Sequence, residues 1–154
     1  MTNQRIGKPT LNDAIALAIS EHRGQRDKIG KPYIFHPLRV MQHMDTDKEK
    51  IVAVLHDVVE DTSITLDDLL SKGYSNEIVD AIDCLSKRGS EEYFDYIERV
   101  KKSPMAIQVK LADLQDNMDP NRIPDESEQA KKERLAVYKK AYKILMAEIN
   151  RIKP

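Results

Sequence analysis

Apolar residues recur along this chain at three- and four-residue steps, separated by short polar breaks, and sustained strict alternation is hard to find. Three- and four-residue spacing puts side chains on one face of a helix, whereas strict alternation is typical of a half-buried strand. We therefore expect an all-α fold. The predicted helices cover about residues 11–22, 37–44, 47–61, 66–72, 77–87, 91–102, 104–118 and 127–152.

Residues suited to capping precede most of these predicted helices. A Ser, Thr, Asp or Asn at the N-cap accepts a hydrogen bond from a backbone N–H of the first turn, which would otherwise be unpaired. Thr46 with Glu49 has the spacing of a capping box. The further candidates are Thr10 or Asn12, Thr65 with Asp68, Ser75 or Asn76, Ser90, and Ser103 followed by Pro104.

Length and composition favour one globular domain. The chain has 154 residues, of which 40% are hydrophobic and 33% charged, enough for a sizeable core but with little room for a second one. We find no internal repeat, low-complexity tract or linker. We expect a single domain over residues 1–154, without an attached synthetase or regulatory region.

Charge and motif content exclude several classes of function. Lys and Arg total 25 and Asp and Glu total 26, so the formal charge is −1 and no global attraction to nucleic acid or anionic lipid is expected. No apolar run approaches the roughly 20 residues of a membrane helix, and the N-terminus lacks a secretory pattern. Cys84 is the single cysteine. We expect a cytoplasmic protein without an internal disulfide, nucleic-acid partner, membrane anchor or Gly-rich phosphate loop.

His56 and Asp57 stand side by side in an otherwise apolar stretch. Two polar side chains in the core would cost several kcal/mol if unpaired, so they need partners, and a divalent cation would satisfy both. Glu60 follows four residues after His56, which places it on the same helix face one turn away. A carboxylate beside a metal ion is well placed to act as a general base or acid.

Two further residues complete a candidate metal site. His36 opens the helix after the first polar break, and Asp113 lies inside another apolar helix. Two imidazoles and two carboxylates suit manganese, iron, zinc or magnesium, and ligand type alone does not select among them. We expect one divalent ion, with Mn²⁺ as first choice, held by His36, His56, Asp57 and Asp113.

These residues match a known pattern. His36, His56-Asp57 and Asp113 resemble the H…HD…D signature of the HD-domain metal-dependent phosphohydrolases, an all-helical superfamily. HRGQRDKIGKPYIFHP, LHDVVEDTSIT and VKLADLQDN resemble the three motif blocks of the alarmone hydrolase domain of bacterial Rel/Spo proteins and their stand-alone small relatives. The resemblance covers roughly residues 10–145. It implies a single-domain HD-type helical bundle with one manganese ion.

The resemblance also implies an activity and roles for further residues. The family removes the 3′-pyrophosphate from guanosine tetra- or pentaphosphate, with Glu60 and Asp61 as the acid/base pair beside the metal-bound water. Asn117 would contact the nucleotide. A pyrophosphate substrate requires fixed cations, and we assign phosphate binding to the basic cluster Arg23, Arg26, Lys28 and Lys31.

Two departures from the family pattern keep other functions open. Asp27 stands where the family usually carries an arginine, and Leu114 where it often has a basic residue. The alternatives are an HD phosphohydrolase acting on a different phosphorylated nucleotide, and a metal- and nucleotide-binding sensor without turnover. A two-iron oxygenase is disfavoured because it would need extra histidines near the site, and His22 and His43 are too few and badly placed. Both are expected to be surface or packing residues. The sequence leaves homo-oligomerisation open.

Overall fold

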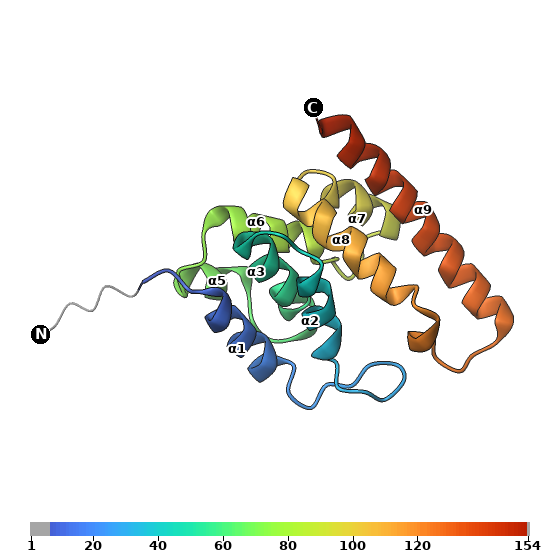
Figure 1. The fold of residues 1–154 in the computed structure, drawn as a ribbon, viewed down its shortest axis with the longest axis horizontal. Coiled ribbons are helices and arrows are strands. Elements are labelled where there is room, and N and C mark those ends of the chain that lie inside the picture. The colour runs from blue at the N-terminus through green and yellow to red at the C-terminus, as the bar shows by residue number, and fades with distance from the viewer. Residues whose placement is uncertain (1–6, 154) are drawn as a thin grey trace, which may run out of the picture.

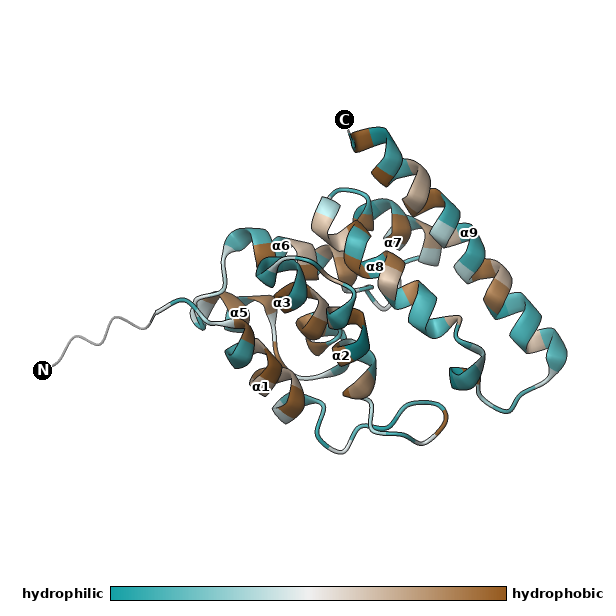
Figure 2. Cartoon of the chain, viewed as in Figure 1, coloured by the Kyte–Doolittle hydropathy of each residue, from teal (hydrophilic) through white to brown (hydrophobic). Residues whose placement is uncertain are grey.

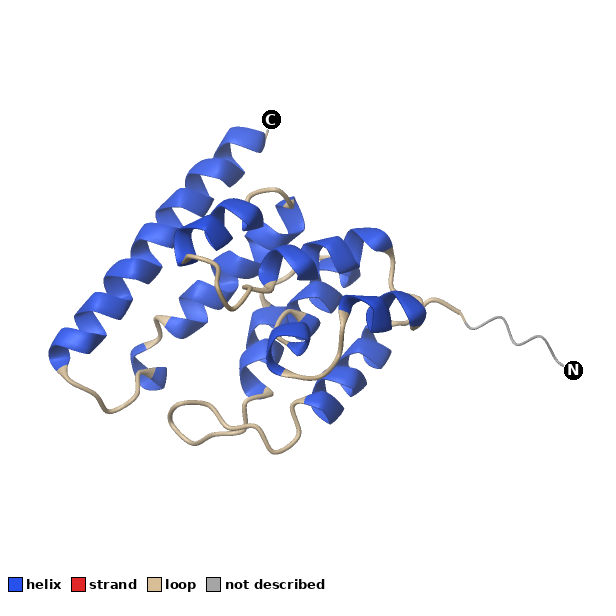
Figure 3. Cartoon of the chain, turned by 180° about the vertical axis from the view of Figure 1, so that it is seen from behind, coloured by secondary structure: helices blue, strands red, loops and turns tan. Residues whose placement is uncertain are grey.

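A computed structural model describes residues 7–153 of the chain, and its regular elements are all helical (Figure 3). The expected all-α fold is therefore confirmed. The elements are α1 (Leu11–Glu21), α2 (Phe35–Gln42), α3 (Asp47–Leu55), α4 (Val58–Asp61), α5 (Leu66–Ser71), α6 (Asn76–Leu85), α7 (Tyr93–Val100), α8 (Pro104–Asn117), the 3₁₀ turn η1 (Pro120–Arg122) and α9 (Glu128–Ile152).

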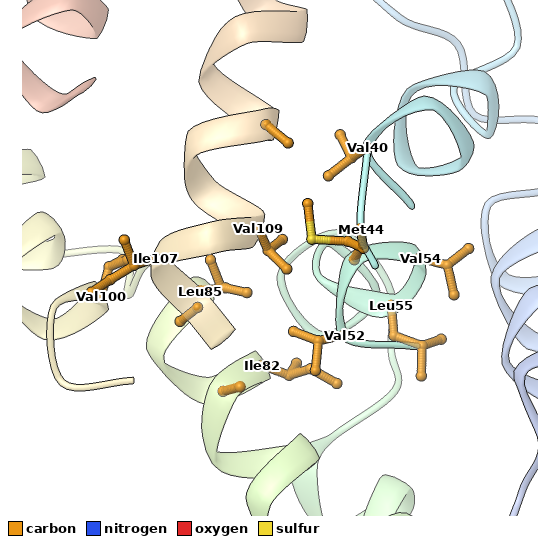
Figure 4. Packing of buried hydrophobic residues seen from close by; sticks show 14 of the residues in the cluster. Val40, Met44, Val52, Val54, Leu55, Ile82, Leu85, Val100, Ile107 and Val109 are labelled. Carbon is orange, nitrogen blue, oxygen red and sulfur yellow. The ribbon is translucent and has the colours of Figure 1, made fainter. Parts of the chain in front are cut away.

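Helix α3 is the centre of the core. It packs against α1, α2, α6 and α8, and its last five residues, Ile51 to Leu55, are all buried. Val52 of α3 lies in one cluster with side chains from the surrounding helices, among them Val40, Ile82 and Val109 (Figure 4). A helix that is apolar on every side is stable only when neighbours surround it. This explains why the residues that follow α3 also lie deep in the molecule.

The long helix α9 lies across α7 and α8 at the C-terminal end of the chain (Figure 1). Apolar residues recur along α9 between longer polar stretches (Figure 2). Its buried positions are Ala141, Leu145 and Ile149, while Tyr138 and Tyr142 pack against the core with part of each ring exposed. Among residues 7–153, no helix has both the length and the apolar character needed to cross a bilayer.

Most predicted helix starts are correct. Thr10, Thr46, Thr65, Ser75 and Ser103 each accept a hydrogen bond from the first turn of the helix that they precede. The prediction for Ser90 is wrong. Helix α7 begins at Tyr93, and its N-cap residue Glu92 makes no side-chain capping bond.

The predicted helix over residues 47–61 is broken at His56 and Asp57. α3 ends at Leu55 and α4 begins at Val58. The carbonyl oxygen of Ala53 accepts hydrogen bonds from both the backbone N–H and the ring Nδ1 of His56, at 3.4 and 2.5 Å. A side chain that bonds to a nearby carbonyl competes with the backbone ladder of the helix. Both residues keep αR backbone angles, so the chain makes a short turn between α3 and α4.

Candidate metal centre and active site

The structure brings His36, His56, Asp57 and Asp113 together. His36 comes from α2, His56 and Asp57 from the junction of α3 and α4, and Asp113 from α8. Oδ1 of Asp113 lies 2.8 Å from Nε2 of His36 and 3.5 Å from Nε2 of His56. Oδ2 of Asp57 lies 3.7 and 3.0 Å from the same two nitrogens. Elements distant in sequence therefore supply one compact donor set.

The donor set fits a divalent cation. Ligand atoms of His36, His56 and Asp57 all lie within 4.8 Å of one another. A carbonyl can only accept, so Nδ1 of His56 carries the proton that is donated to Ala53, and its Nε2 is the ring nitrogen that faces the donor set. That Nε2 is buried and makes no hydrogen bond. Because buried polar atoms are rarely left unpaired, this nitrogen fits the role of a metal ligand.

His36 is oriented from outside the donor set by Asp116. Its Nδ1 lies 2.6 Å from Oδ2 of Asp116, one turn after Asp113 on α8. Burial raises the pKa of Asp116, but hydrogen bonds from His36 and Arg39 outweigh it and hold the pKa at about 2. The ionised carboxylate accepts from Nδ1, which leaves Nε2 of His36 facing the donor set. Sequence reasoning missed Asp116, although its three-residue spacing from Asp113 was visible.

The two aspartates of the donor set have partners of their own. The hydroxyl of Tyr33 donates to Oδ2 of Asp57. Nζ of Lys110 lies 2.7 Å from Oδ2 of Asp113. Burial raises the pKa of Asp113, but the charge of Lys110 and hydrogen bonds from the two histidines hold it well below its ordinary value. Both aspartates are therefore available as anionic ligands.

Glu60 and Asp61 lie at the end of α4, beside the donor set. Oε2 of Glu60 accepts from the backbone N–H of Lys87 at 3.3 Å, and Oδ2 of Asp61 accepts from Nε2 of Gln25 at 3.2 Å. Both side chains reach solvent. Partial burial, and then the negative charge of Asp57, raises the pKa of each carboxyl group. A raised pKa suits a group that exchanges protons near neutral pH.

His22 supports this side of the site. Its Nδ1 lies 2.8 Å from Oε1 of Gln25, and its ring is 5.1 Å from that of Tyr33. His22 was expected to be either a surface or a packing residue. Its exposed fraction is 2%, so it is a packing residue. His43 is exposed, as expected.

Two adjoining cavities lead to the donor set. The inner one, of about 170 Å³, is lined by the four candidate ligands together with Lys87, Lys110, Tyr93 and Tyr96. The outer one measures about 420 Å³. Tyr33, Glu60 and Asn117 line both. Asn117 also donates to Oδ1 of Asp113 at 3.3 Å. The proposed nucleotide contact thus stands where the two cavities meet.

The outer cavity is rich in cations. Its charged lining residues are Arg26, Asp27, Lys28, Glu60, Arg122, Lys131 and Arg134. Of the predicted basic cluster, Arg26 and Lys28 line this cavity, while Arg23 and Lys31 line neither cavity. Sequence reasoning missed Arg122, Lys131 and Arg134, which follow the last motif block and resemble ordinary surface charges in sequence.

Asp27 closes the loop that carries the basic cluster. Its Oδ1 accepts from the backbone N–H groups of Ile29 and Lys31 at 3.0 and 2.9 Å. Gly30, with φ +83°, supplies the left-handed residue of the turn. Oδ2 of Asp27 lies 3.9 Å from Nη2 of Arg122. The acidic residue therefore has a local structural role, and a cation from another segment stands beside it.

This helical fold, with a His/Asp donor set between α2, α3 and α8, is the arrangement expected of an HD-type hydrolase domain. Comparison with known proteins supports that class. The chain is 30% identical over 145 residues to a guanosine-3′,5′-bis(diphosphate) 3′-pyrophosphohydrolase of Vibrio cholerae, covering 83% of this chain and 20% of the relative. It is 31% identical over 145 residues to the bifunctional (p)ppGpp synthase/hydrolase SpoT of Escherichia coli, with the same coverage.

Two further comparisons concern a relative named for synthesis and a solved structure. The chain is 32% identical over 137 residues to a GTP pyrophosphokinase of Streptomyces coelicolor, covering 80% of this chain and 16% of that protein. A solved structure of a metazoan orthologue of SpoT that hydrolyses ppGpp superposes with a TM-score of 0.74 at 24% identity, covering 95% of this chain and 96% of the other. No protein-family model matches the chain.

The resemblance seen in the three motif blocks is confirmed: the chain is similar in sequence to (p)ppGpp 3′-pyrophosphohydrolases, SpoT among them, and it has the all-α fold of a ppGpp hydrolase. The chain spans no more than a fifth of the length of these curated relatives. Their names include both hydrolysis and synthesis.

Proposed function

We propose that this protein is a metal-dependent phosphohydrolase that removes the 3′-pyrophosphate from guanosine tetra- or pentaphosphate. The observation that carries the proposal is the buried His/Asp donor set at the bottom of a cavity that opens into a cation-rich one. Of the two activities in the relatives' names, this set supports hydrolysis, because imidazole and carboxylate ligands beside an open cavity suit the activation of water.

We propose Mn²⁺ as the ion and His36, His56, Asp57 and Asp113 as its ligands. A bound divalent ion would lower the pKa of water toward about 7 and offset negative charge on the phosphate oxygens. The protein's own contribution is to present two imidazole Nε2 atoms and two carboxylates in fixed directions. The hydrogen bonds that the two Nδ1 atoms donate to Ala53 and Asp116 support this assignment.

Glu60 and Asp61 are the proposed acid/base pair. In the proposed reaction, the hydroxide part of a water molecule adds to the phosphorus next to the ribose 3′-oxygen. The bond between that phosphorus and the 3′-oxygen breaks, and the 3′-oxygen gains a proton. The products are pyrophosphate and GDP or GTP. Glu60 is placed at both cavities and can take the proton from water, while Gln25 holds Asp61 next to it.

The outer cavity is the proposed site for the rest of the nucleotide. Arg26 and Lys28 can contact phosphate oxygens from its rim, and Asn117 can contact the nucleotide where the cavities join. The proposal extends to residues 1–154 acting as one domain on a free nucleotide in the cytoplasm, rather than on nucleic acid or at a membrane. The net charge of −1 supports this, because the cations are concentrated at the cavity.

The decisive experiment is a substrate panel with purified protein and Mn²⁺. We expect pyrophosphate release from guanosine tetra- and pentaphosphate, loss of that release with EDTA, and its loss in Asp57→Ala. Asp67→Ala is the matched control, because Asp67 is an exposed residue of α5 away from the site. Unchanged activity in Asp57→Ala would contradict the proposal.

A second candidate is hydrolysis of a different phosphorylated nucleotide. Asp27 in the wall of the outer cavity favours it, because a carboxylate there repels a phosphate group that an arginine would attract. GDP, GTP and ATP in the same panel separate the two candidates. Mn²⁺-dependent stabilisation without hydrolysis of any panel member would instead support a sensor without turnover.

A further inference from the structure

The proposed metal site is supported by a network of charged side chains that lies outside it and connects several elements. At its centre is the carboxylate of Asp116. Arg39 donates to it through Nε at 2.8 Å and Nη2 at 3.2 Å, and Arg122 donates through Nη1 at 2.8 Å. The third partner is Nδ1 of His36. Both oxygens of Asp116 therefore have donors.

Arg122 contacts other groups of this network besides the carboxylate of Asp116. Its Nη1 also lies 3.2 Å from the backbone oxygen of Asp116 and 3.1 Å from Oδ1 of Asn117. Its Nη2 faces Asp27 across 3.9 Å. The side chain of Arg122 is 13% exposed, whereas that of Arg39 is 40% exposed. Because exposed ion pairs are screened by solvent, the charge of Arg122 is screened less than that of Arg39.

The geometry points to Arg122 as a positioning residue for the proposed metal site. Through Asp116 it holds the ring of His36 with Nε2 toward the donor set, and through Asn117 it holds the amide that faces Asp113. This inference rests on the proposed function, since it assumes that His36 and Asp113 bind a metal ion.

The hydrogen-bond roles support both connections. Oδ1 of Asn117 accepts from Arg122, so its Nδ2 must be the atom that donates to Oδ1 of Asp113. Nη1 of Arg122 donates to Oδ2 of Asp116, the same oxygen that accepts from Nδ1 of His36, so the guanidinium fixes the position of that oxygen. A lysine could supply the charge but not the planar guanidinium, whose Nη1 contacts Asp116 and Asn117 while its Nη2 faces Asp27.

The test measures Mn²⁺ binding directly, by calorimetric titration of the full chain, together with the unfolding temperature in EDTA and in Mn²⁺. We expect Arg122→Gln and Asp116→Asn each to weaken Mn²⁺ binding by about 10- to 100-fold. Arg122→Lys should bind Mn²⁺ more tightly than Arg122→Gln. Arg151→Gln is the control, because Arg151 makes an exposed ion pair with Glu148 far along α9, and it should bind like the unmodified chain.

The outcomes separate this inference from the proposed function. An unmodified chain that takes up no Mn²⁺ would overturn both. An unmodified chain that binds Mn²⁺, with Arg122→Gln and Asp116→Asn binding equally tightly, would overturn the positioning role alone. A purely structural role would lower the unfolding temperature equally in EDTA and in Mn²⁺, so an unchanged Mn²⁺-dependent shift in both variants would also overturn the inference.

Discussion

The hydroxyl of Tyr33 donates a hydrogen bond to Oδ2 of Asp57, the same oxygen that lies 3.0 Å from Nε2 of His56. Tyr33 precedes α2 and also lines both cavities. One side chain thus fixes the direction of a candidate metal ligand and forms part of the wall that a substrate would meet. Outer partners of this kind keep a carboxylate ligand in place when its metal ion leaves.

Tyr33→Phe should therefore weaken Mn²⁺ binding by about 10-fold and slow hydrolysis to a similar degree, because Asp57 loses a donor but keeps its charge. Calorimetric titration and a pyrophosphate release assay check the two effects. Tyr74→Phe is the matched control: it removes a phenol oxygen from a ring that is 5% exposed and lines a separate cavity near Pro9. Equal Mn²⁺ affinity in both variants would show that the Tyr33 hydroxyl does not support the site.

Glu60→Gln should reduce activity and stabilise the metal-free fold at the same time. Partial burial and the charge of Asp57 raise the pKa of Glu60 in the folded protein. The folded state then holds the proton more tightly than the unfolded state, so stability falls as the pH rises through that pKa. At pH 7 the charge of Glu60 opposes folding, and the neutral amide removes it. We expect a higher unfolding temperature in EDTA and a loss of about 100-fold or more in rate.

Differential scanning calorimetry at pH 7 and a hydrolysis assay measure these two effects. Glu98→Gln serves as the control, because the side chain of Glu98 is 61% exposed and pairs with Lys101 on the surface. It should change neither quantity appreciably. A Glu60→Gln protein that keeps full activity would remove Glu60 from the proposed acid/base pair.

Lys110 should stabilise the metal-free protein by neutralising Asp113. The two side chains are 11% and 6% exposed, and their charged atoms are 2.7 Å apart. Lys110→Met removes the cation and leaves a buried carboxylate, which costs about 3–5 kcal/mol when one partner of a buried pair is lost. Mn²⁺ should recover part of this loss, because it supplies positive charge to the same aspartate.

The free energy of unfolding in urea, with EDTA and with Mn²⁺, tests this expectation. The matched control is Lys48→Met. Lys48 pairs with Glu77 at 2.8 Å, but the two side chains are 59% and 58% exposed, so its loss should cost no more than about 1 kcal/mol. Similar destabilisation by the two substitutions would contradict a special role for Lys110.

The sequence predicted the helical class, and it named His36, His56, Asp57 and Asp113, which the structure places together. These predictions succeeded because an ionisable side chain in an apolar helix is a local signal that needs a partner. The break at His56 could not be predicted. It depends on competition for the Ala53 carbonyl, which periodicity does not reveal.

Residues that act through long-range contacts were also beyond sequence reasoning. Arg122, in a short turn after α8, reads as an ordinary loop charge until the fold places it against Asp116. Conversely, Arg23 and Lys31 belong to a dense basic cluster but line neither cavity. Charge density in sequence does not say which side of a loop faces a cavity.

A final prediction concerns the segment that carries Lys87, whose backbone N–H donates to Glu60. Arg99 holds this segment: it donates to the backbone oxygens of Asp83 and Ser86 at 3.0 and 2.8 Å and pairs with Glu91 at 2.6 Å. Hydrogen bonds from Arg99 lower the pKa of Glu91 to about 2. The stabilisation from Glu91 is therefore present above its unfolded-state pKa, about 4.3, and is lost as the pH falls toward 2.

The unmodified protein should accordingly be more stable than Glu91→Gln at pH 7. This difference in stability should become smaller as the pH falls from about 4.3 toward 2. Unfolding temperatures measured at intervals across this range give this difference directly. Glu128→Gln is the control, because the side chain of Glu128 is 93% exposed and lies 3.4 Å from Lys131. This variant should unfold at nearly the same temperature as the unmodified protein at every pH. If the unmodified protein and Glu91→Gln differed in unfolding temperature by the same amount at pH 7 and pH 3, Arg99 would hold the segment through the two backbone oxygens alone. The ionised state of Glu91 would then not help to position Lys87 beside Glu60.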